Sequence, residues 1–441
     1  MDRIAYKKLI EWRNKPSEYR KPLILEGARQ VGKTWLLEEL GHEAFEIVAE
    51  INFEEQRRLV GLFEDDFDTN RILSAIQLAT GTKLVPGKTL IILDEIQEAK
   101  RGVLALKYLL KNVPQYHIAA AGSLLGLSLH QGESFPVGKV EFLNLYPMSF
   151  AEFLLATGRK SLWETLQSLD WKLVAIFKNE YIEALRQYYF VGGMPEVLSE
   201  YVRHHDFIKT RQVQKDLLAS YSKDFSKHPP VEEISRINLV WDNIPAQLAK
   251  ENKKFIYGHL KKGSRAKDFE SAISWLVNAG TIYKVTRINN ASIPVRGFED
   301  SNAFKLYTLD VGLLGAMAGL NPQTLLDGNT LFGQYKGALT EQYVLQQLKC
   351  MEDISVHYWS SDAGTAEVDF VIQRGGHIIP IEVKAEENLK AKSLKSYREK
   401  YRPALSLRFS MSDYREQEDL VNIPLYAVPM LPDILDYHIG R

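Results

Sequence analysis

Short apolar runs and amphipathic segments alternate along the first third of the chain. A run that is apolar at every position predicts a strand buried on both faces, whereas apolar residues repeated every three or four positions predict a helix with one buried side. Strands that alternate with helices are typical of an α/β fold with a parallel sheet. The expected strands cover 22–25, 45–53, 89–95 and 117–123, and the expected helices cover 3–13, 35–40, 54–80 and 103–110.

The pattern becomes mainly helical after residue 148. Apolar residues at helical spacing continue through 149–225, and the segment 192–195 (Gly-Gly-Met-Pro) interrupts them with a tight turn. Residues 231–290 predict three helices followed by a strand at 281–285, which is the order of a winged-helix domain.

The C-terminal part predicts a helix followed by a hairpin. Residues 335–349 carry apolar residues along one side of a helix, and 368–372 and 378–384 predict two strands. The two glycines at 375–376 lie between these strands and are typical of a hairpin turn. We therefore expect a second α/β region at this end of the chain.

Composition narrows the range of partners. Among the 441 residues, 55 Lys and Arg balance 56 Asp and Glu, so a nucleic acid must be met by a local basic patch and not by the whole chain's charge. The single cysteine, Cys350, excludes an intrachain disulfide and suits a cytoplasmic protein. No apolar run approaches the roughly 18 residues of a membrane span, and the polar start does not resemble a signal peptide. We expect a cytoplasmic location and no membrane partner.

Residues 27–34 (Gly-Ala-Arg-Gln-Val-Gly-Lys-Thr) lie between the first expected strand and its helix. Strand, loop and helix give the G-x-x-x-x-G-K-[ST] pattern the context of a P-loop. The two glycines let backbone N–H groups turn toward phosphate oxygens, and the helix N-terminus adds its dipole. Lys33 can reach the β- and γ-phosphates, and Thr34 can bind Mg²⁺. The expected ATP-binding residues are Gly27, Ala28, Arg29, Gln30, Val31, Gly32, Lys33 and Thr34.

Polar residues follow two of the expected core strands. Asp94 and Glu95 come directly after the apolar run at 90–93, at the end of a strand where an open α/β sheet places its chemistry. Asp94 fits the Walker B residue that holds Mg²⁺, and Glu95 fits the base that orients the attacking water. Ser123 ends the next strand, where a sensor of the γ-phosphate is expected. A helix cap for the acids and a loop-starting serine are the structural alternatives.

These motifs resemble a family of prokaryotic AAA-type ATPases. The resemblance is carried by the segments 23–34, 93–97, 121–123, 133–140 and 145–150. It implies an ATPase followed by a C-terminal region of unassigned function. Many relatives carry Arg where this chain has Lys139. Lysine lacks the planar fork that suits a finger acting on a neighbouring subunit. A homo-oligomer therefore stays an open expectation.

The resemblance and the patterns together predict four domains. They are a P-loop core of the ASCE or AAA type with a parallel sheet at 1–148, a helical lid at 149–230, a winged-helix domain at 231–330 and an α/β restriction-endonuclease-like domain at 331–441. Four basic residues beside the third expected helix suit contact with nucleic-acid phosphates. They are Lys261, Lys262, Arg265 and Lys267. A spacer or a protein-docking module is the alternative interpretation of the winged helix.

The expected C-terminal hairpin brings together residues suited to a metal site. Glu382 and Lys384 are two positions apart and share a face of their strand, and Asp369 can come level with Glu382 across the hairpin. Asp369, Glu382 and the carbonyl of Val383 can hold a divalent metal through oxygen ligands, and Lys384 can orient a water against a phosphodiester. Asp followed by Glu-x-Lys resembles the restriction-endonuclease-like nucleases. Glu341 matches the acid that this superfamily often places on the preceding helix. An exposed, salt-bridged strand is the alternative.

A basic run beyond Lys384 admits two interpretations. It can follow a nucleic-acid backbone, or it can be an ordinary solvated helix face. Its members are Lys390, Lys392, Lys395, Arg398, Lys400 and Arg402.

The sequence favours an ATP-driven protein that acts on DNA and carries a C-terminal metal-dependent nuclease domain. The alternative is a nucleotide-regulated protein whose C-terminal domain binds nucleic acid or protein and cuts nothing. A third interpretation is a signalling ATPase with a protein partner. These interpretations differ in the role of Glu341, Asp369, Glu382 and Lys384.

Overall fold

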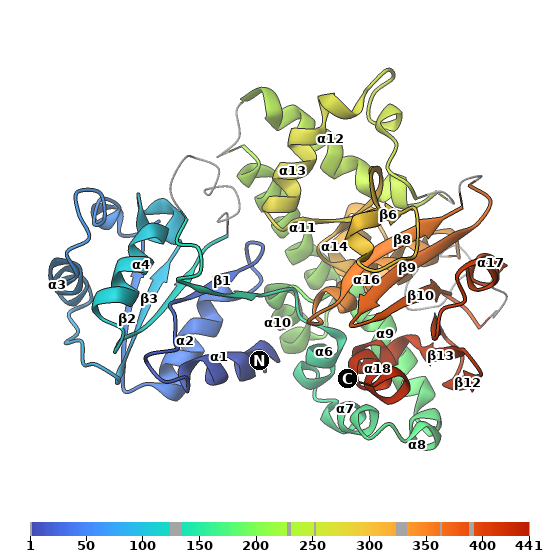
Figure 1. Ribbon diagram of the computed structural model, residues 1–441, viewed down its shortest axis with the longest axis horizontal. Helices are drawn as coiled ribbons and strands as arrows, with labels where there is room; N and C mark the ends of the chain where they lie inside the picture. Colours follow the sequence, from blue (N-terminus) through green and yellow to red (C-terminus); the bar gives the residue numbers. More distant parts are fainter. Residues whose placement is uncertain are drawn as a thin grey trace. The chain divides into compact units, whose positions relative to one another are not determined.

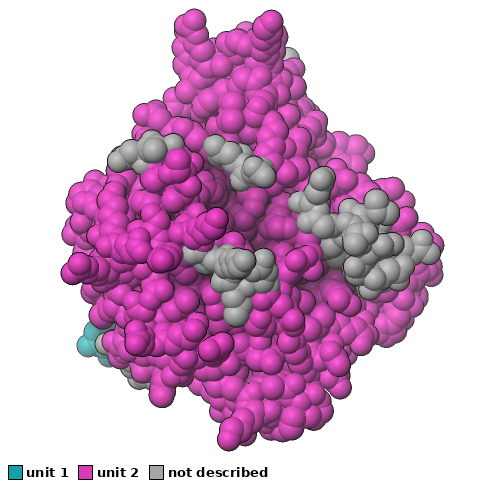
Figure 2. All heavy atoms as spheres, turned by 90° about the vertical axis from the view of Figure 1, so that its right-hand side faces the viewer, with its two compact units in different colours: residues 1–146, 278–280 teal, residues 147–277, 281–441 magenta. Residues whose placement is uncertain are grey.

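The computed structural model describes residues 2–123, 135–226, 231–250, 253–322, 333–361, 364–387 and 392–440. The chain divides into two compact units (Figure 2). Unit 1 comprises residues 1–146 and 278–280, and unit 2 comprises 147–277 and 281–441. The four domains expected from the sequence remain a prediction about finer divisions of these units. Among the described residues, no helix is both long enough and apolar enough to cross a membrane.

Unit 1 is built on a parallel five-stranded sheet in the order β2-β3-β4-β1-β5 (Figure 1). This confirms the α/β fold with a parallel sheet. Helix α2 contacts β2, β3 and β4, and α3 contacts β2 and α4. The strands are β1 (Leu23–Glu26), β2 (Ile47–Asn52), β3 (Thr89–Asp94), β4 (His117–Ala121) and β5 (Glu141–Asn144). The helices are α1 (Ala5–Arg13), α2 (Lys33–Ala44), α3 (Thr69–Thr80) and α4 (Gly102–Asn112), with 3-10 helices η1 (Arg57–Leu59) and η2 (Ile96–Glu98).

Two expectations for unit 1 differ from the structure. The helix expected over 54–80 is formed only at 57–59 and 69–80. Asp68 starts α3 by accepting a hydrogen bond from the backbone N–H of Asn70, so the acidic segment before it stays outside the helix. Strand β5 was not expected, because its four residues are alternately half-buried and exposed and give no continuous apolar signal.

Unit 2 combines a group of helices with an eight-stranded mixed sheet in the order β12-β13-β11-β10-β9-β8-β6-β7 (Figure 1). The strands are β6 (Ile282–Ile288), β7 (Glu299–Thr308), β8 (Ser355–Ser360), β9 (Glu367–Arg374), β10 (His377–Val383), β11 (Ser406–Ser410), β12 (Arg415–Gln417) and β13 (Leu420–Pro424). The first helices are α6 (Phe150–Ala156), α7 (Lys160–Gln167), α8 (Trp171–Ile176), α9 (Lys178–Val191), α10 (Pro195–His204) and α11 (Phe207–Asp224). The later ones are α12 (Val231–Leu248), α13 (Glu270–Asn278), α14 (Val311–Met317), α16 (Gly333–Lys349), α17 (Lys392–Tyr401) and α18 (Leu431–Ile439).

The winged-helix interpretation of 231–330 is not confirmed. The first two of the three helices expected within 231–290 form one helix, α12, which contains Pro245. The third helix begins at Glu270, so the basic segment 261–267 precedes it. Strand β6 pairs with β7 and also with β8, which places these strands in the same sheet as the C-terminal ones. Such a pairing joins residues far apart in sequence, and no local pattern predicts it.

The Gly-Gly turn lies in the buried centre of unit 2. The backbone N–H of Gly193 donates to Asp310 Oδ2 at 2.6 Å, and its carbonyl accepts from the N–H of Met148 at 2.6 Å. A Cβ on Gly193 would lie 2.0 Å from the carbonyl oxygen of Met148. Asp310 is fully buried and also accepts from Leu313 N–H and Gln346. The turn therefore requires glycine because the backbone of another segment occupies the position of a side chain.

We expect Gly193→Ala to lower the free energy of unfolding by about 1–3 kcal/mol, because the new methyl group must displace the Met148 backbone. Denaturant unfolding of the full chain measures the change. Gly376→Ala is the matched control, since a Cβ there meets nothing within 4 Å. Equal stabilities of the two variants would contradict this account of the turn.

Candidate functional site

The P-loop has the backbone conformation that its sequence predicts. Gly27 has a φ of 145° and Gly32 a φ of 91°, and α2 begins at the next residue, Lys33. At Gly27 a Cβ would lie 2.2 Å from the carbonyl oxygen of Leu145, so a side chain has no space there. Gln30 also adopts a positive φ, 63°. The loop thus curls between β1 and the N-terminus of α2, where backbone N–H groups can meet phosphate oxygens.

Lys33 lies within the curl of the loop. Its Nζ donates to the carbonyls of Gly27 at 3.0 Å and Ala28 at 2.8 Å, and to Ser123 Oγ at 3.2 Å. The side chain is buried, and burial lowers the pKa of its ammonium group to about 8, against the attraction of Glu95 and Asp94. A poorly hydrated ammonium group held beside backbone N–H donors suits a phosphate oxygen as its partner.

Thr34 and Asp94 meet at the carboxyl edge of the sheet. The Thr34 hydroxyl donates to Asp94 Oδ2 at 3.0 Å, and the Asn52 amide donates to the same oxygen at 3.0 Å. Burial and the neighbouring Glu95 raise the pKa of Asp94 above its usual value. A hydroxyl and a buried carboxylate side by side form an oxygen donor set that fits Mg²⁺. The motif analysis did not identify Asn52. The feature that could have identified Asn52 is its position at the end of β2, where it pairs in register with Asp94 on β3.

Glu95 and Ser123 complete the group. Glu95 has a left-handed backbone, φ 48°, and its carboxylate accepts from Ser123 Oγ at 3.2 Å and from the amide of Gln97. Ser123 therefore bridges Lys33 and Glu95. Gln97 lies within the segment that carries the family resemblance, but sequence reasoning gave it no role. Hydrogen bonds thus join Lys33, Ser123 and Glu95 in one series, and Thr34 is bonded to Asp94 beside it.

Two other residues of unit 1 lie at its surface. Arg29 forms an ion pair with Glu54 at 3.2 Å. Lys139 is exposed and lies in a turn closed by its N–H to the carbonyl of Pro136. Residues 133 and 134 of the same motif lie outside the described residues.

The C-terminal hairpin has the expected register. Phe370 pairs with Ile381, so the next positions, Asp369 and Glu382, are level across β9 and β10. Asp369 Oδ2 accepts from the backbone N–H of Val383 at 2.7 Å. Lys384 pairs with Glu382 Oε1 at 2.6 Å. Asp369, Glu382 and Lys384 are therefore brought together as the sequence predicts.

Glu341 lies near these residues but has other partners. Its carboxylate forms an ion pair with Lys253 and accepts from the Tyr307 hydroxyl at 3.2 Å. Burial alone would raise its pKa, but Lys253 and Lys305 outweigh burial and lower it. Lys305 is fully buried and pairs with Glu367 at 2.5 Å. Sequence reasoning missed both lysines, because they lie far along the chain from the acids that they neutralise.

The acids of this region fit a metal ion only in part. No group of three or more His, Cys, Asp or Glu side chains in the described ranges is placed to hold one. Glu382 Oε2, however, is buried and has no hydrogen-bond partner among the described residues. Burial and the neighbouring Glu341 and Glu382 raise the pKa of Asp369 well above its usual value. Two adjacent carboxylates with an unpartnered oxygen can accept a divalent cation, and Glu341 would then act as an outer neighbour.

The basic residues beyond Lys384 have mixed surroundings. Lys395 pairs with Glu399 at 3.8 Å on the surface of α17, and Arg398 pairs with Asp419. The ammonium group of Lys400 lies over the Tyr401 ring. Lys390 lies outside the described residues. The nucleic-acid interpretation of this helix stays a prediction.

Three family models match segments of the chain. Residues 19–154 match the family described as an AAA domain. Residues 182–324 and 336–428 match two families described as domains of unknown function. No curated protein matches the chain. The P-loop, the parallel sheet and this match agree on one class: residues 19–154 are similar to an AAA-type P-loop ATPase domain.

Three solved structures are among those that match the chain. A Walker-type ATPase of Pyrococcus abyssi is 18% identical over 72% of this chain and 95% of its own, with a TM-score of 0.44. The Drosophila ORC bound to DNA is 16% identical over 71% of this chain and 94% of its own, with a TM-score of 0.25. A STAND protein with a tetratricopeptide repeat sensor from Pyrococcus horikoshii is 14% identical over 79% of this chain and 45% of its own, with a TM-score of 0.26. Because all three TM-scores are below 0.5, these structures do not contribute to the assignment.

The buried Lys33 predicts a pH dependence of folding. Its pKa is about 8 in the folded chain against an ordinary 10.5, so between these values the unfolded chain binds more protons. Stability should therefore rise with pH from about 8 to 10.5. Lys33→Met should flatten this rise in denaturant unfolding, whereas Lys111→Met, at an exposed position, should preserve it. Parallel pH profiles for Lys33→Met and the wild type would refute the effect of burial.

Proposed function

We propose that the chain hydrolyses ATP at the P-loop and uses the cycle to act on DNA through unit 2. The observation that carries the ATPase part is the hydrogen-bonded series Lys33, Ser123 and Glu95, with Thr34 bonded to Asp94 beside it. The AAA-domain match over 19–154 supports the same conclusion.

Each residue of this group has a different role in the proposed hydrolysis. Backbone N–H groups of the loop bind the phosphates, and Lys33 stabilises the charge that develops on the oxygens of the transferred group. Glu95 accepts the proton of the attacking water as the water oxygen bonds to the γ-phosphorus, while the bond from that phosphorus to the bridging oxygen breaks and ADP leaves with the electron pair. Ser123 positions Glu95. Thr34 and Asp94 would hold Mg²⁺, which supplies positive charge to the phosphates when it is bound.

Action on DNA rests on exposed basic residues of unit 2. Lys261, Lys262, Arg265 and Lys267 are all exposed, in the segment before α13. Four cations in a short segment can neutralise backbone phosphates without reading bases. This part of the proposal does not require the winged-helix fold.

Cleavage of nucleic acid is a second candidate function of unit 2. It is favoured by the unpartnered Glu382 Oε2 next to Asp369 and by Lys384 at 2.6 Å from the other Glu382 oxygen. Asp369 and Glu382 would hold a divalent ion, which would polarise the phosphodiester, and Lys384 would orient the water. The pairing of Glu341 with Lys253 favours instead a module that binds and does not cut.

Replacing the base should separate binding from turnover. Glu95→Gln should still bind ATP, but its kcat for ATP hydrolysis should fall by about 10²–10⁴-fold because the amide cannot accept the proton. Steady-state phosphate release measures turnover, and nucleotide titration measures binding. Glu98→Gln, at the end of the 3-10 helix that begins after Glu95, is the matched control and should hydrolyse ATP at the wild-type rate. An equal rate in Glu95→Gln would remove Glu95 from the mechanism.

The two interpretations of unit 2 make different predictions for metal and cutting. In the nuclease case, Mn²⁺ or Mg²⁺ should support cleavage of plasmid, linear or single-stranded DNA, and Asp369→Asn should abolish both metal binding and cleavage. Lys384→Ala should keep metal affinity within about threefold and lose cleavage by about 10²-fold or more, because it acts on the water and not on the metal.

Glu399→Gln on exposed α17 is the control for loss of an acid in the same unit, and it should cut normally. Absence of cleavage by the wild type on all substrates, together with unchanged calorimetric metal binding in Asp369→Asn, would leave the binding-only module.

A further inference from the structure

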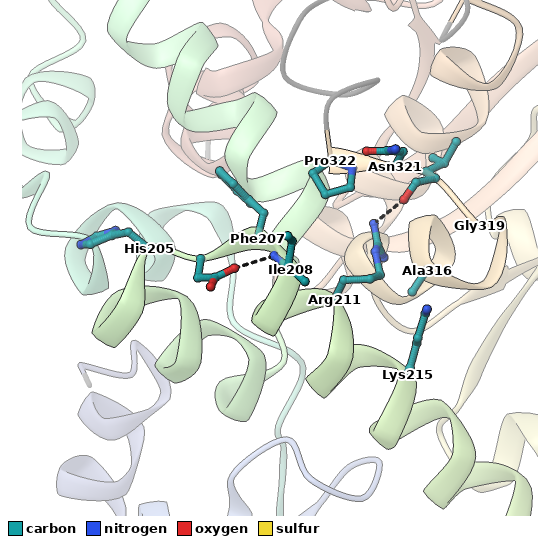
Figure 3. Close-up of a pocket in the computed structure, with 11 residues that line it drawn as sticks. His205, Phe207, Ile208, Arg211, Lys215, Ala316, Gly319, Asn321 and Pro322 are labelled. Carbon is teal, nitrogen blue, oxygen red and sulfur yellow. Dashed lines mark hydrogen bonds between the residues drawn. The ribbon is translucent and has the colours of Figure 1, made fainter.

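Unit 2 contains a cavity of about 850 Å³ whose lining residues include none of those in the two regions described above. It lies between the turn that joins α10 to α11 and the C-terminal end of α14 with the residues after it. Figure 3 shows the side chains of Arg211 and Lys215 rising from α11 toward the segment of Ala316, Gly319 and Asn321. A cavity of this volume is within the range that encloses a small molecule.

Arg211 is a buried cation without a carboxylate partner. It is 9% exposed, and no acid of the described ranges lies within ion-pair distance of it. It donates to the side-chain oxygen of Gln214 at 2.7 Å, to the carbonyl of Gly312 at 3.4 Å and to the carbonyl of Leu320 at 3.1 Å. These bonds use three of the five guanidinium N–H groups. The Nε–H is buried and has no partner in the described part of the chain.

The surroundings of Arg211 do not neutralise its charge. The guanidinium group lies 4.2 Å from the centre of the Phe190 ring, and burial lowers the pKa of Arg211 to about 10. Lys215, one helical turn along α11, also lines the cavity and makes no ion pair with a described residue. One acid, Asp206, lines it, but its carboxylate caps α11 by accepting from Ile208 and Lys209 N–H. Two cations thus line the cavity, and the one acid that lines it is hydrogen-bonded to backbone N–H groups.

The rest of the lining is largely apolar. Phe207, Ile208, Ala316, Leu320 and Pro322 contribute hydrocarbon surface, and Ile208 is 79% exposed. A large aliphatic side chain left this open at the rim of a cavity can cover the apolar part of a bound molecule.

We propose that this cavity binds a small organic anion, an oxyanion group carried on an apolar body. The oxyanion would meet Arg211 and Lys215, and the apolar body would lie against Phe207, Ile208 and Leu320. A carboxylate and a phosphate monoester share this chemistry, because a planar guanidinium edge suits both groups. The site is independent of the ATPase proposal and does not share a residue with it.

The test is calorimetric titration of the full chain with three probes of similar shape. They are 3-phenylpropionate, phenyl phosphate and the neutral 3-phenylpropanamide. At least one anion should bind at one site per chain with a Kd of about 1 mM or tighter, and the amide should bind at least about tenfold more weakly. The stronger of the two anions identifies the oxyanion class.

Variants locate the binding. Lys215→Glu should raise the Kd for the anion by about tenfold or more, because it reverses one of the two positive charges at the cavity. Lys209→Glu is the matched control on the same exposed helix, outside the lining, and should change the Kd by less than about twofold. Lys33→Ala should bind the anion as tightly as the wild type, which separates this site from the P-loop. Arg211 is not substituted, because its bonds also join α11 to the end of α14.

Several outcomes overturn the proposal. The first is that neither anion binds up to about 10 mM, a concentration at which a millimolar Kd is still measurable. The second is that the amide binds as tightly as the anions. The others are equal effects of Lys215→Glu and Lys209→Glu, and loss of anion binding in Lys33→Ala. Failure here leaves the ATPase proposal intact, since the Glu95→Gln measurement decides that proposal separately.

Discussion

The hydrogen bond from Thr34 to Asp94 is the contact on which the arrangement of unit 1 depends. It joins the start of α2 to the end of β3, and it forms only if β1 and β3 run parallel and end at the same edge. The sheet order places β4 between these two strands. The residue that follows β4, Ser123, therefore lies between Lys33 and Glu95 and bonds to both. The order of the strands, more than any single motif, brings these predicted site residues together.

Unit 2 is constrained by the cost of burying charge. Glu341, Asp369 and Glu382 lie among apolar strands and a buried helix, where an unpaired carboxylate is expensive. Lys253 neutralises the first and Lys384 the third, while Lys305 pairs with the adjacent Glu367. These pairs offset part of the buried negative charge, yet they leave one Glu382 oxygen without a partner among the described residues. The same residues therefore carry both proposals for unit 2, a metal-dependent nuclease and a module that only binds.

The helices of unit 2 are joined by polar groups that have no access to water. Asp310 is bonded to Gly193, Leu313 and Gln346, and Tyr188 donates to the carbonyl of Met148 at 2.5 Å. Burial raises the pKa of Asp310, and the bonds from backbone N–H groups oppose that rise. Arg211 is also buried, and no acid among the described residues forms an ion pair with it.

The sequence by itself determined the parts of this protein that are local. The glycines and Lys33 of the P-loop, the acids after β3 and the level of Asp369 with Glu382 follow from spacing, because neighbouring residues in a loop or hairpin have few ways to face each other. Only the tertiary structure decided which distant residues and strands these elements contact. Glu341 meets Lys253 across 88 residues, Asn52 reaches Asp94 across 42, and β6 joins the sheet of β8. Such contacts depend on how whole elements pack, and apolar periodicity fixes which face is buried but not what it is buried against.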